Sequence, residues 1–405
     1  MHVLLFDDPA IRPHLLPFTF TRPVAALRCG ILTIAEKWQH HLQADVSFLT
    51  QEYLQVKFPA CPPDEPVLLV NGAVCPDDVL IQQIRALEPG EALMDQELFV
   101  AMHLTEASSV LNAGVEALWR ARVPFNKQVA EPVQSIRQVW HLFLHNGAEI
   151  RRDFELLTRG RESEPVNDVH TIVYAPENIF IEPGVKIRAA ILNAEDGPIY
   201  LGKNSQVHEG AILKGPLALG EGSHINAGAK MRGDNTVGPY CKVGGEVGNS
   251  IFFGFSNKGH DGYLGNSVVG EWCNLGADTN SSNLKNNYAP VKIWSHAAKR
   301  FVSTGQQFCG LMMGDHSKCG INTMFNTGTV VGVAANIFGA GFPRTFIPSF
   351  SWGGASGFET FKLPKVTEIA ERVMARRNLA YDTTEQAIMA HIFEETKEER
   401  VWEKA

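Results

Sequence analysis

Hydrophobic positions follow two different patterns along this chain. Up to about residue 160, short apolar runs such as HVLLF and EPVLLVNGAV alternate with stretches of helical periodicity such as GILTIAEKWQHHL and PDDVLIQQIRAL. The short runs predict buried strands and the longer stretches predict amphipathic helices. Pro76 and the acids that follow it are typical of a helix N-terminus. The alternation predicts an α/β domain with a mostly parallel sheet, whose ligands bind at the carboxyl ends of the strands.

The second pattern begins near Thr171, where apolar residues and glycines recur every six residues. The sequence IYLGKN-SQVHEG-AILKGP-LALGEG-SHINAG-AKMRGD covers residues 199–234, and 27 of the 36 glycines lie between Gly184 and Gly341. A six-residue period is typical of a parallel β-helix, in which three short strands make one coil of about 18 residues. Aliphatic residues then point inward, while glycine and asparagine occupy the corners. A flexible linker would lack the regularly spaced Ile, Val and Leu.

Two segments depart from the six-residue period. The sequence SSNLKNNYAPVKIWSHAAKRFVS, residues 281–303, lacks it, which predicts an excursion from the coil. The tail carries VTEIAERVMARRN and EQAIMAHIFEETKEERVW, which predict amphipathic helices that cap the β-helix or pack on a neighbour. With TRGRESEPVND interpreted as a polar linker, the predicted domains are 1–160, 170–345 and 364–405.

Composition and charge narrow the classes of partner. The chain has 405 residues and a net charge of −8, which argues against nucleic acid as a partner because phosphate backbones bind basic surfaces. No apolar run reaches the length of a membrane span, and the start MHVLLFDDPA lacks the basic leader of a signal peptide. Seven widely spaced cysteines without a CxxC pair indicate free thiols in a reducing, cytoplasmic compartment. They are Cys29, Cys61, Cys75, Cys241, Cys273, Cys309 and Cys319.

The stretch NKGHDGYLGN, residues 257–266, holds the strongest candidate for chemistry. His260 lies between Gly259 and Gly262, which have no side chains to block a substrate. Imidazole is the side chain best suited to act as a base near neutral pH. Asn274 follows fourteen residues later, close to one coil, so we expect it on a neighbouring coil near His260.

Three further histidines in the repeat, His208, His224 and His316, are interpreted as corner or surface residues.

The stretch around His260 resembles a known enzyme signature. GHDGYLGNSVVGEWCNLGADTNSSN, residues 259–283, is similar to the acetyltransferase signature of the bifunctional N-acetylglucosamine-1-phosphate uridyltransferase/glucosamine-1-phosphate acetyltransferase family. The resemblance implies a left-handed β-helix that assembles as a homotrimer and uses acetyl-CoA. It implies that His260 and Asn274 are catalytic and that Tyr263 and Asn283 bind substrate. The acetyl transfer to an amine that it implies also needs donors to a tetrahedral oxyanion and groups that hold the acceptor. Backbone amides near Gly276 and Ala277 are the candidate donors to that oxyanion or to the thioester of the cofactor. Leu284 stands where the family has a tyrosine.

The N-terminal region resembles sugar-1-phosphate nucleotidyltransferases more weakly, which implies a Rossmann-like nucleotide-binding domain. In IRPHLLPFTFTRPVAALRCGILTI the candidate nucleotide-binding cations are Arg12, Arg22 and Arg28, and the loop after the buried strand adds Asn71 and Gly72. The family's glycine pair is replaced by FDDPAIRP, and Ala73 stands where an aspartate would hold Mg²⁺. Asp77 or Asp78 could substitute only if the loop is rebuilt. Mg²⁺ is therefore expected only if this domain is active.

The phosphates of the expected substrates require cations. For the sugar phosphate the candidates are Arg232, Lys242 and Lys258. For the phosphates of the cofactor they are Lys299, Arg300 and Arg344. Each of these side chains is equally interpretable as a solvated surface charge.

Three functions remain open at this point. The first is a bifunctional enzyme of sugar-nucleotide biosynthesis that acetylates an amino-sugar 1-phosphate and couples a sugar 1-phosphate to a nucleotide. The second is a nucleotidyltransferase, forming a UDP- or dTDP-sugar, whose β-helix serves only for trimerisation. The third is a protein that binds sugar nucleotides without catalysis. The run of Tyr263, Asn274 and Asn283 favours a functional acetyl site.

Overall fold

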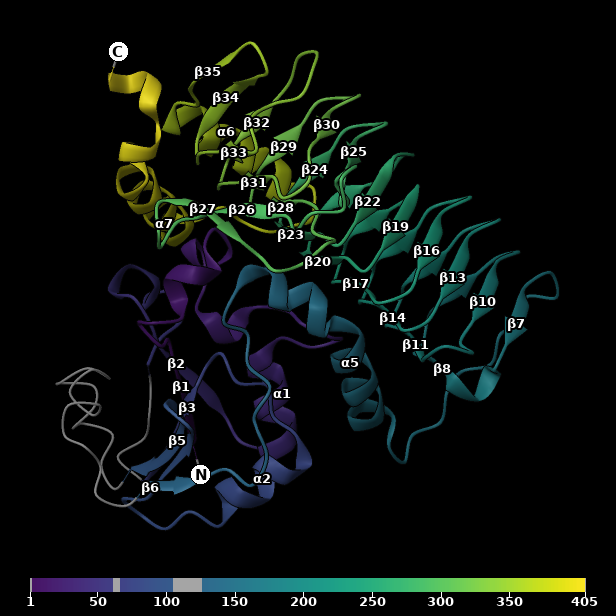
Figure 1. The fold of residues 1–405 in the computed structure, drawn as a ribbon. Helices are drawn as coiled ribbons and strands as arrows, with labels where there is room; N and C mark the ends of the chain where they lie inside the picture. The colour runs from purple at the N-terminus through teal and green to yellow at the C-terminus, as the bar shows by residue number, and fades with distance from the viewer. Residues whose placement is uncertain (1, 61–65, 105–125, 405) are drawn as a thin grey trace. The chain divides into compact units, whose positions relative to one another are not determined.

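The computed structural model describes residues 2–60, 66–104 and 126–404. The chain forms two compact units, Met1–Leu27 with Leu32–Val139, and Arg28–Ile31 with Trp140–Ala405 (Figure 1). The predicted fold class, an α/β domain followed by a parallel β-helix and a helical tail, is confirmed.

The first unit is built on one six-stranded sheet. Its order is β2 (Val46–Leu49), β1 (His2–Phe6), β3 (Val67–Asn71), β5 (Leu98–Leu104), β4 (Ala92–Asp95) and β6 (Asn126–Gln128). Three pairings are parallel, and the two made by β5 are antiparallel. Leu4, Phe6 and Leu69 belong to its core, as the apolar runs predicted, and Phe99 of β5 joins them.

The helices of this unit begin where their capping residues lie. Helix α1 (Ile34–Leu42) starts after Thr33, whose side chain accepts from the Glu36 N–H while the Glu36 carboxylate accepts from the Thr33 N–H. Helix α2 (Asp78–Arg85) is capped by Asp77. Short 3₁₀ helices connect the strands: η1 (Arg12–Leu15), η2 (Phe18–Phe20), η3 (Val24–Ala26) and η4 (Glu52–Leu54).

The second unit contains a long helix and a β-helix with three parallel sheets. The long helix is α5 (Val139–Thr158). Sheet 1 contains β7 (Ile172–Tyr174), β10 (Ile191–Asn193), β13 (Ile212–Lys214), β16 (Lys230–Arg232), β19 (Glu246–Gly248) and β22 (Tyr263–Gly265). Sheet 2 contains β8 (Ile179–Ile181), β11 (Ile199–Leu201), β14 (Leu217–Leu219), β17 (Asn235–Val237), β20 (Ile251–Gly254), β23 (Val268–Glu271), β28 (Met312–Met313), β31 (Val330–Val331) and β33 (Phe346–Ile347). Sheet 3 contains β9 (Lys186–Ile187), β12 (Gln206–Val207), β15 (His224–Ile225), β18 (Lys242–Val243), β21 (Asn257–Lys258), β24 (Asn274–Leu275), β29 (Lys318–Cys319), β32 (Asn336–Ile337), β34 (Ser351–Gly354) and the antiparallel β35 (Gly357–Thr360).

The six-residue period holds because each short strand turns one apolar side chain inward. On sheet 3, Val207, Ile225, Val243, Leu275 and Ile337 are all buried and belong to one continuous core. The residue before each of them on its strand points outward, because side chains alternate along a strand. The β-helix therefore separates a buried ladder from an outward ladder on every sheet.

One corner of the β-helix is built from aromatic residues, although the sequence predicted glycine and asparagine there. Tyr240, Phe255, Trp272 and His316 take the left-handed backbone conformation, with φ between 54° and 60°. Their rings stack in succession, Phe255 on Trp272 with centroids 4.3 Å apart and Tyr240 on Phe255 at 5.5 Å. We call these four residues the aromatic corner. The stacking contributes about 1 kcal/mol for each pair, which offsets backbone strain of similar size.

Helix α5 is held against the coils of the second unit by side-chain hydrogen bonds. The Asn146 amide donates to the Asp234 carbonyl at 2.9 Å, and its oxygen accepts from the Thr236 hydroxyl at 3.0 Å. Gly147 lies against Asp234 so closely that an added Cβ would fall 2.0 Å from a carboxylate oxygen. This contact explains why the helix carries a glycine near its middle.

The predicted excursion and tail are both present. The excursion contains the antiparallel pair β26 (Lys292–Ser295) and β27 (Arg300–Ser303), and β25 (Asn280–Ser281) pairs with β30 (Met324–Phe325). The tail contains α6 (Leu363–Ala375), α7 (Thr383–Glu395), η6 (Lys397–Glu399) and η7 (Val401–Lys404), and η5 (Pro176–Asn178) precedes β8. Helix α6 packs on the aromatic corner, since Ala370, Met374 and Tyr381 form one buried cluster with Trp272.

The cysteines and helices of the described residues agree with the expectations from composition. Six cysteines are free and buried, and Cys61 lies outside the described residues. No helix in the described part of the chain is long and apolar enough to cross a membrane.

Candidate functional site

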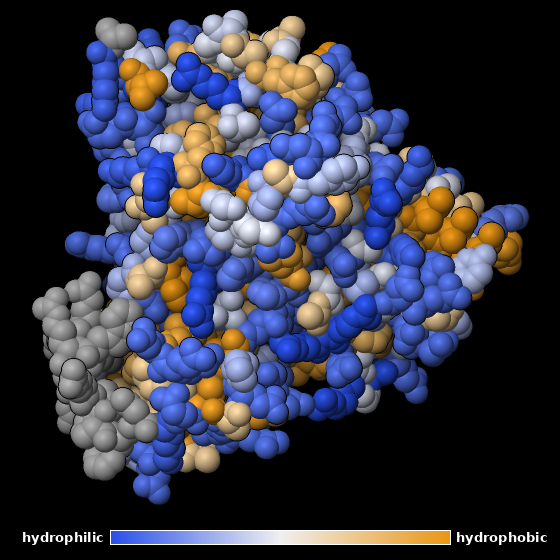
Figure 2. Space-filling view, in the orientation of Figure 1, coloured by the Kyte–Doolittle hydropathy of each residue, from blue (hydrophilic) through white to orange (hydrophobic). Residues whose placement is uncertain are grey.

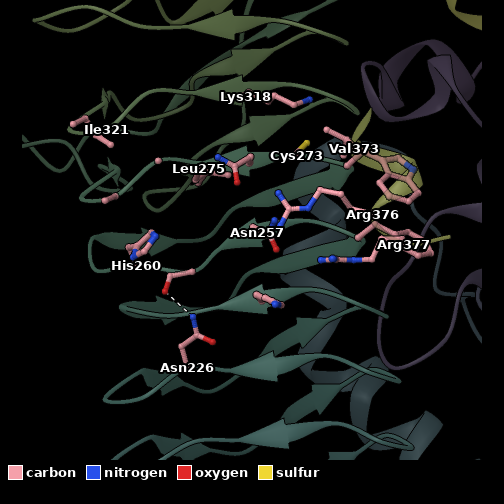
Figure 3. A pocket seen from close by; sticks show the side chains of 17 residues that line it. Asn226, Asn257, His260, Cys273, Leu275, Lys318, Ile321, Val373, Arg376 and Arg377 are labelled. Atoms are coloured by element: carbon pink, nitrogen blue, oxygen red, sulfur yellow. Dashed lines mark hydrogen bonds between the residues drawn. The ribbon is translucent and has the colours of Figure 1, made fainter. Parts of the chain in front are cut away.

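A cavity of about 550 Å³ lies on the outer face of sheet 3. Strands β18, β21, β24 and β29, the corners that follow β21 and β24, and the C-terminal end of α6 line it (Figure 3). His260, Asn274, Lys242 and Ala277, all singled out from the sequence, meet there. Volumes of this size are typical of small-molecule sites.

The floor of the cavity is the outward ladder of sheet 3. Lys242, Asn257, Asn274 and Lys318 are register partners on successive strands, so their side chains follow one another along one face. Sequence reasoning identified Lys242 and Asn274 and missed Asn257 and Lys318. Lys318 could have been found, because it directly precedes the inward Cys319. Asn257 could not, because the inward residue that follows it is the lysine Lys258.

His260 lies on the corner after β21, and its backbone is fixed by neighbouring coils. The Asn226 amide donates to the Gly259 carbonyl at 2.7 Å, and the Lys258 ammonium donates to the His260 carbonyl at 2.9 Å. Gly262 closes the corner with φ +118°, and a Cβ there would lie 2.2 Å from the Thr279 carbonyl oxygen. The His260 ring itself is exposed within the cavity wall.

Lys258 occupies an inward position of the core rather than the cavity. It pairs in register with Val243 and is only 1% exposed. Its ammonium donates to the carbonyls of Gly244, at 3.2 Å, and His260. Burial lowers the pKa of Lys258 to about 8. The sequence predicted that Lys258 contacts a sugar phosphate, but its ammonium lies inside the coil. Lys258 instead holds the backbone of the His260 corner in position.

Tyr263 and Asn283 lie together but outside this cavity. Tyr263 is on β22 of sheet 1, and the Asn283 amide donates to its hydroxyl at 3.0 Å and to the Asn266 side-chain oxygen at 2.8 Å. On the same sheet Arg232 forms an exposed ion pair with Glu246 at 2.8 Å. The residues that the sequence placed in one site therefore fall in two groups on neighbouring faces.

The cations expected for the cofactor also lie elsewhere. Lys299 and Arg344 line a second cavity of about 570 Å³ together with Trp294 and Trp402. Arg300 is exposed on β27, opposite Ser295.

The cavity of His260 receives two other cations, Arg376 and Arg377, from the end of α6. The sequence RRN at the end of an amphipathic helix was the available signal, but the tail was expected only to cap the β-helix or to pack on a neighbour.

The three arginines proposed for nucleotide binding are all engaged in structural contacts. Arg12 is buried, with its Nε 3.2 Å from an Asp7 carboxylate oxygen, and Arg22 is 5% exposed. Arg28 belongs to the second unit, where its Nε donates to the Phe253 carbonyl at 3.2 Å. None of the three guanidinium groups is therefore available to a nucleotide without breaking these contacts.

The loop after β3 is closed by its own hydrogen bonds. The Asn71 amide donates to Asp8 at 3.1 Å and to the Phe99 carbonyl at 3.0 Å, and its oxygen accepts from the Ala73 N–H. Gly72 packs against the Phe6 carbonyl, 3.0 Å from where a Cβ would lie. Within residues 2–60, 66–104 and 126–404 no group of three His, Cys, Asp or Glu side chains could hold a metal ion. We therefore assign no Mg²⁺ ligand.

Comparison with known proteins supports the resemblance seen in the sequence. Residues 3–162 match the family model described as sugar nucleotidyl transferase. The bifunctional protein GlmU of Methanocaldococcus jannaschii is 38% identical over 87 residues, 22% of this chain and 21% of that protein. The bifunctional sugar-1-phosphate nucleotidylyltransferase/acetyltransferase of Sulfurisphaera tokodaii is 32% identical over 93 residues, 23% of each chain. The chain thus spans about a fifth of the length of the curated relatives it matches.

Two solved structures are similar to about half of this chain at low sequence identity. The polySia specific acetyltransferase NeuO is 14% identical, with 48% of this chain and 83% of that chain covered and a TM-score of 0.26. AntD, an N-acyltransferase from Bacillus cereus solved with dTDP and coenzyme A, is 14% identical, with 53% and 100% covered and a TM-score of 0.23.

The buried ammonium of Lys258 predicts a pH-dependent stability. Its pKa in the folded protein, about 8, lies below the ordinary lysine value of 10.5, so the unfolded chain binds more protons between these values. Stability should therefore rise with pH in that window. Relative to Lys258→Met, we expect the free energy of unfolding of the wild type to rise by about 1 kcal/mol between pH 8 and 9.5 in urea titrations. Lys242→Met, which replaces an outward lysine on the neighbouring strand, is the control. If the wild type gains as much stability with pH relative to Lys242→Met as relative to Lys258→Met, the lowered pKa of Lys258 is refuted.

Proposed function

We propose that this protein is a cytoplasmic transferase of sugar-nucleotide biosynthesis, whose β-helix transfers an acetyl group from acetyl-CoA to the amine of an amino-sugar 1-phosphate. The observation that carries the proposal is one cavity that joins an exposed histidine, outward asparagines and several cations. These are the base, the orienting groups and the phosphate partners that such a transfer requires.

The reaction proceeds by attack of the neutral amine on the thioester carbonyl carbon. The new N–C bond forms as the His260 ring accepts a proton from the nitrogen, and the carbonyl oxygen becomes an oxyanion. Collapse of the tetrahedral intermediate breaks the C–S bond, and the proton passes from the imidazolium to the departing thiolate. His260 thus returns to its starting state, and no metal ion is needed in the cycle.

Two nearby groups are suited to hold the oxyanion and the acceptor. The Gly276 N–H already donates to the Cys319 carbonyl at 3.1 Å, so it is committed to the coil. The Ala277 N–H donates to no acceptor within the described residues, which makes it the candidate donor to the oxyanion. Asn274 is exposed on the same wall and is suited to orient the sugar.

His260→Ala should lower the rate of acetyl transfer at least about 100-fold, because a positioned base contributes on the order of 10²–10⁴. The measurement is release of free CoA thiol from acetyl-CoA in the presence of glucosamine 1-phosphate. His208→Ala, a histidine on the same sheet outside the cavity, should behave as the wild type. Undiminished thiol release by His260→Ala in a folded preparation would exclude His260 as the base.

A homotrimer is part of the proposal, and exposed apolar residues on sheet 1 support it. Ile172, Tyr174 and Ile212 are 50%, 46% and 42% exposed, and Ile191 lies in register between the two isoleucines. Figure 2 shows hydrophobic side chains gathered at the end of the β-helix where β7 and β10 lie. A contiguous apolar surface of this kind is typical of an interface between subunits. Such packing would also bring faces of two chains together, including the Tyr263 and Asn283 group.

Sedimentation equilibrium should give the mass of three chains for the wild type and for Ile212→Val. Ile212→Glu places a carboxylate in the apolar surface and should shift the protein to monomers, because an unpaired buried charge costs several kcal/mol. A stable wild-type monomer would contradict the assembly.

A second activity, nucleotidyl transfer in the N-terminal region, is favoured by the match of residues 3–162 to the sugar nucleotidyl transferase family model. In this proposal the domain couples a sugar 1-phosphate to a UTP- or dTTP-derived nucleotide. Mg²⁺ would accompany the triphosphate, and the described residues provide no group of three His, Cys, Asp or Glu side chains that could hold it.

Purified protein incubated with UTP or dTTP, Mg²⁺ and a panel of sugar 1-phosphates should release pyrophosphate. Omission of the sugar phosphate is the control for simple hydrolysis of the nucleotide. Absence of release with every pair would reject nucleotidyl transfer and leave the acetyl site unaffected.

A further inference from the structure

The cavity of His260 is asymmetric in charge. Its charged lining residues, apart from the histidine, are Lys242, Lys318, Arg376 and Arg377, and none of the described lining residues is acidic. Figure 3 shows His260 on one side of the cavity and the two arginines, carried by α6, on the other. A ligand that spans the cavity would therefore meet neutral polar groups at its reactive end and cations at its far end.

These cations are not neutralised by neighbouring carboxylates. Lys242, Arg376 and Arg377 form no ion pair within the described part of the chain. Arg372, one turn earlier on α6, is paired with Glu368 at 2.7 Å. Lys318 is half-buried, its ammonium donates to the His316 carbonyl at 2.9 Å, and desolvation lowers its pKa. Several unpaired cations around one cavity repel one another, and a bound anion would relieve that repulsion.

The titration of a neighbouring histidine reports the same concentration of positive charge. His224 lies on β15, next to Lys242 in register. Its pKa is lowered by burial and then by the charges of Lys242, His208 and Arg377. Lys242 and Arg377, 135 positions apart in the chain, thus act on one common neighbour, and both line the cavity.

The arginines are held at the cavity by a packed helix. Ala370 and Met374 of α6 are buried against Trp272, and Val373 packs on the same cluster while also lining the cavity. Arginines at the C-terminal end of a helix also interact favourably with the helix dipole. The interaction with the helix dipole does not explain why both arginine side chains line the same cavity as Lys242.

We propose that Arg376 and Arg377, together with Lys242, bind the phosphate group of a phosphorylated substrate whose reacting end lies at His260. This inference rests on the proposed acetyl transfer for the identity of the reacting end. Guanidinium groups suit the task because each can donate two parallel hydrogen bonds to phosphate oxygens. The helical tail is then a substrate-binding element. Coenzyme A and the amino-sugar 1-phosphate share this chemistry, and the experiment distinguishes them.

Isothermal titration calorimetry would test the site with two matched pairs of ligands, coenzyme A against pantetheine and glucosamine 1-phosphate against glucosamine. The double variant Arg376→Gln/Arg377→Gln should weaken binding of one phosphorylated ligand at least about 10-fold, because it removes charge-assisted hydrogen bonds to the phosphate. Binding of its phosphate-free partner should not change. The phosphorylated ligand that loses affinity is the one whose phosphate occupies the site.

Arg372→Gln is the matched control, because it removes an arginine from the same helix outside the cavity. If the double variant is poorly folded, Arg377→Lys keeps the charge but removes the planar fork and should show an intermediate loss. Equal affinity of the wild type and the double variant for both phosphorylated ligands would overturn the proposal, as would an equal loss in Arg372→Gln.

Binding separates this inference from the acetyl-transfer proposal. If His260→Ala retains full transfer activity while the arginine variants lose phosphate-dependent binding, the base assignment fails and the phosphate site stands. If His260→Ala is inactive and the arginine variants bind normally, the base assignment stands and the phosphate site fails.

Discussion

The second unit depends on one constraint: every short strand must turn one side chain into a narrow core and then pass through a tight corner. Val243, Leu275 and Ile337 satisfy it with aliphatic side chains on sheet 3. Lys258 satisfies it with a long apolar stem and an ammonium that donates to two backbone carbonyls. Because the inward positions are fixed by packing, the outward positions are free to carry chemistry. Lys242, Asn257, Asn274 and Lys318 form such an outward ladder, and His260 lies on the corner beside it.

The aromatic corner connects this constraint to the tail. Tyr240, Phe255 and Trp272 accept the left-handed conformation that corners require, and their stacked rings leave an apolar surface outside the coil. Helix α6 covers that surface, as an amphipathic helix covers any exposed apolar stripe. The covering helix carries Arg376 and Arg377 to the cavity. The packing of α6 on the aromatic corner thus brings the C-terminal tail to the cavity.

In the first unit, charged and polar side chains near the ends of β1 and β3 are used in structural contacts. Arg12 pairs with Asp7, and the Asn71 loop is tied to Asp8 and Ala73. These residues stabilise the connections after β1 and β3, at the carboxyl ends where ligands of α/β sheets bind. Buried and paired side chains of this kind are costly to disturb. The match to the sugar nucleotidyl transferase family model extends over this region, although the glycines that would admit a triphosphate are absent.

The sequence alone determined the β-helix, its excursion and the His260 corner, because a six-residue period and a local motif require no knowledge of distant contacts. It also placed Asn274 beside His260, since one coil has nearly constant length. It failed where partners are far apart in the chain. Lys258 was indistinguishable from a surface lysine until the register assigned it an inward position. Arg376 and Arg377 joined the site only through the docking of α6 on the aromatic corner. Lys299, on the excursion, and Arg344, shortly before β33, line another cavity instead. Tertiary packing decided these cases, because burial and long-range contacts leave no periodic signal in the chain.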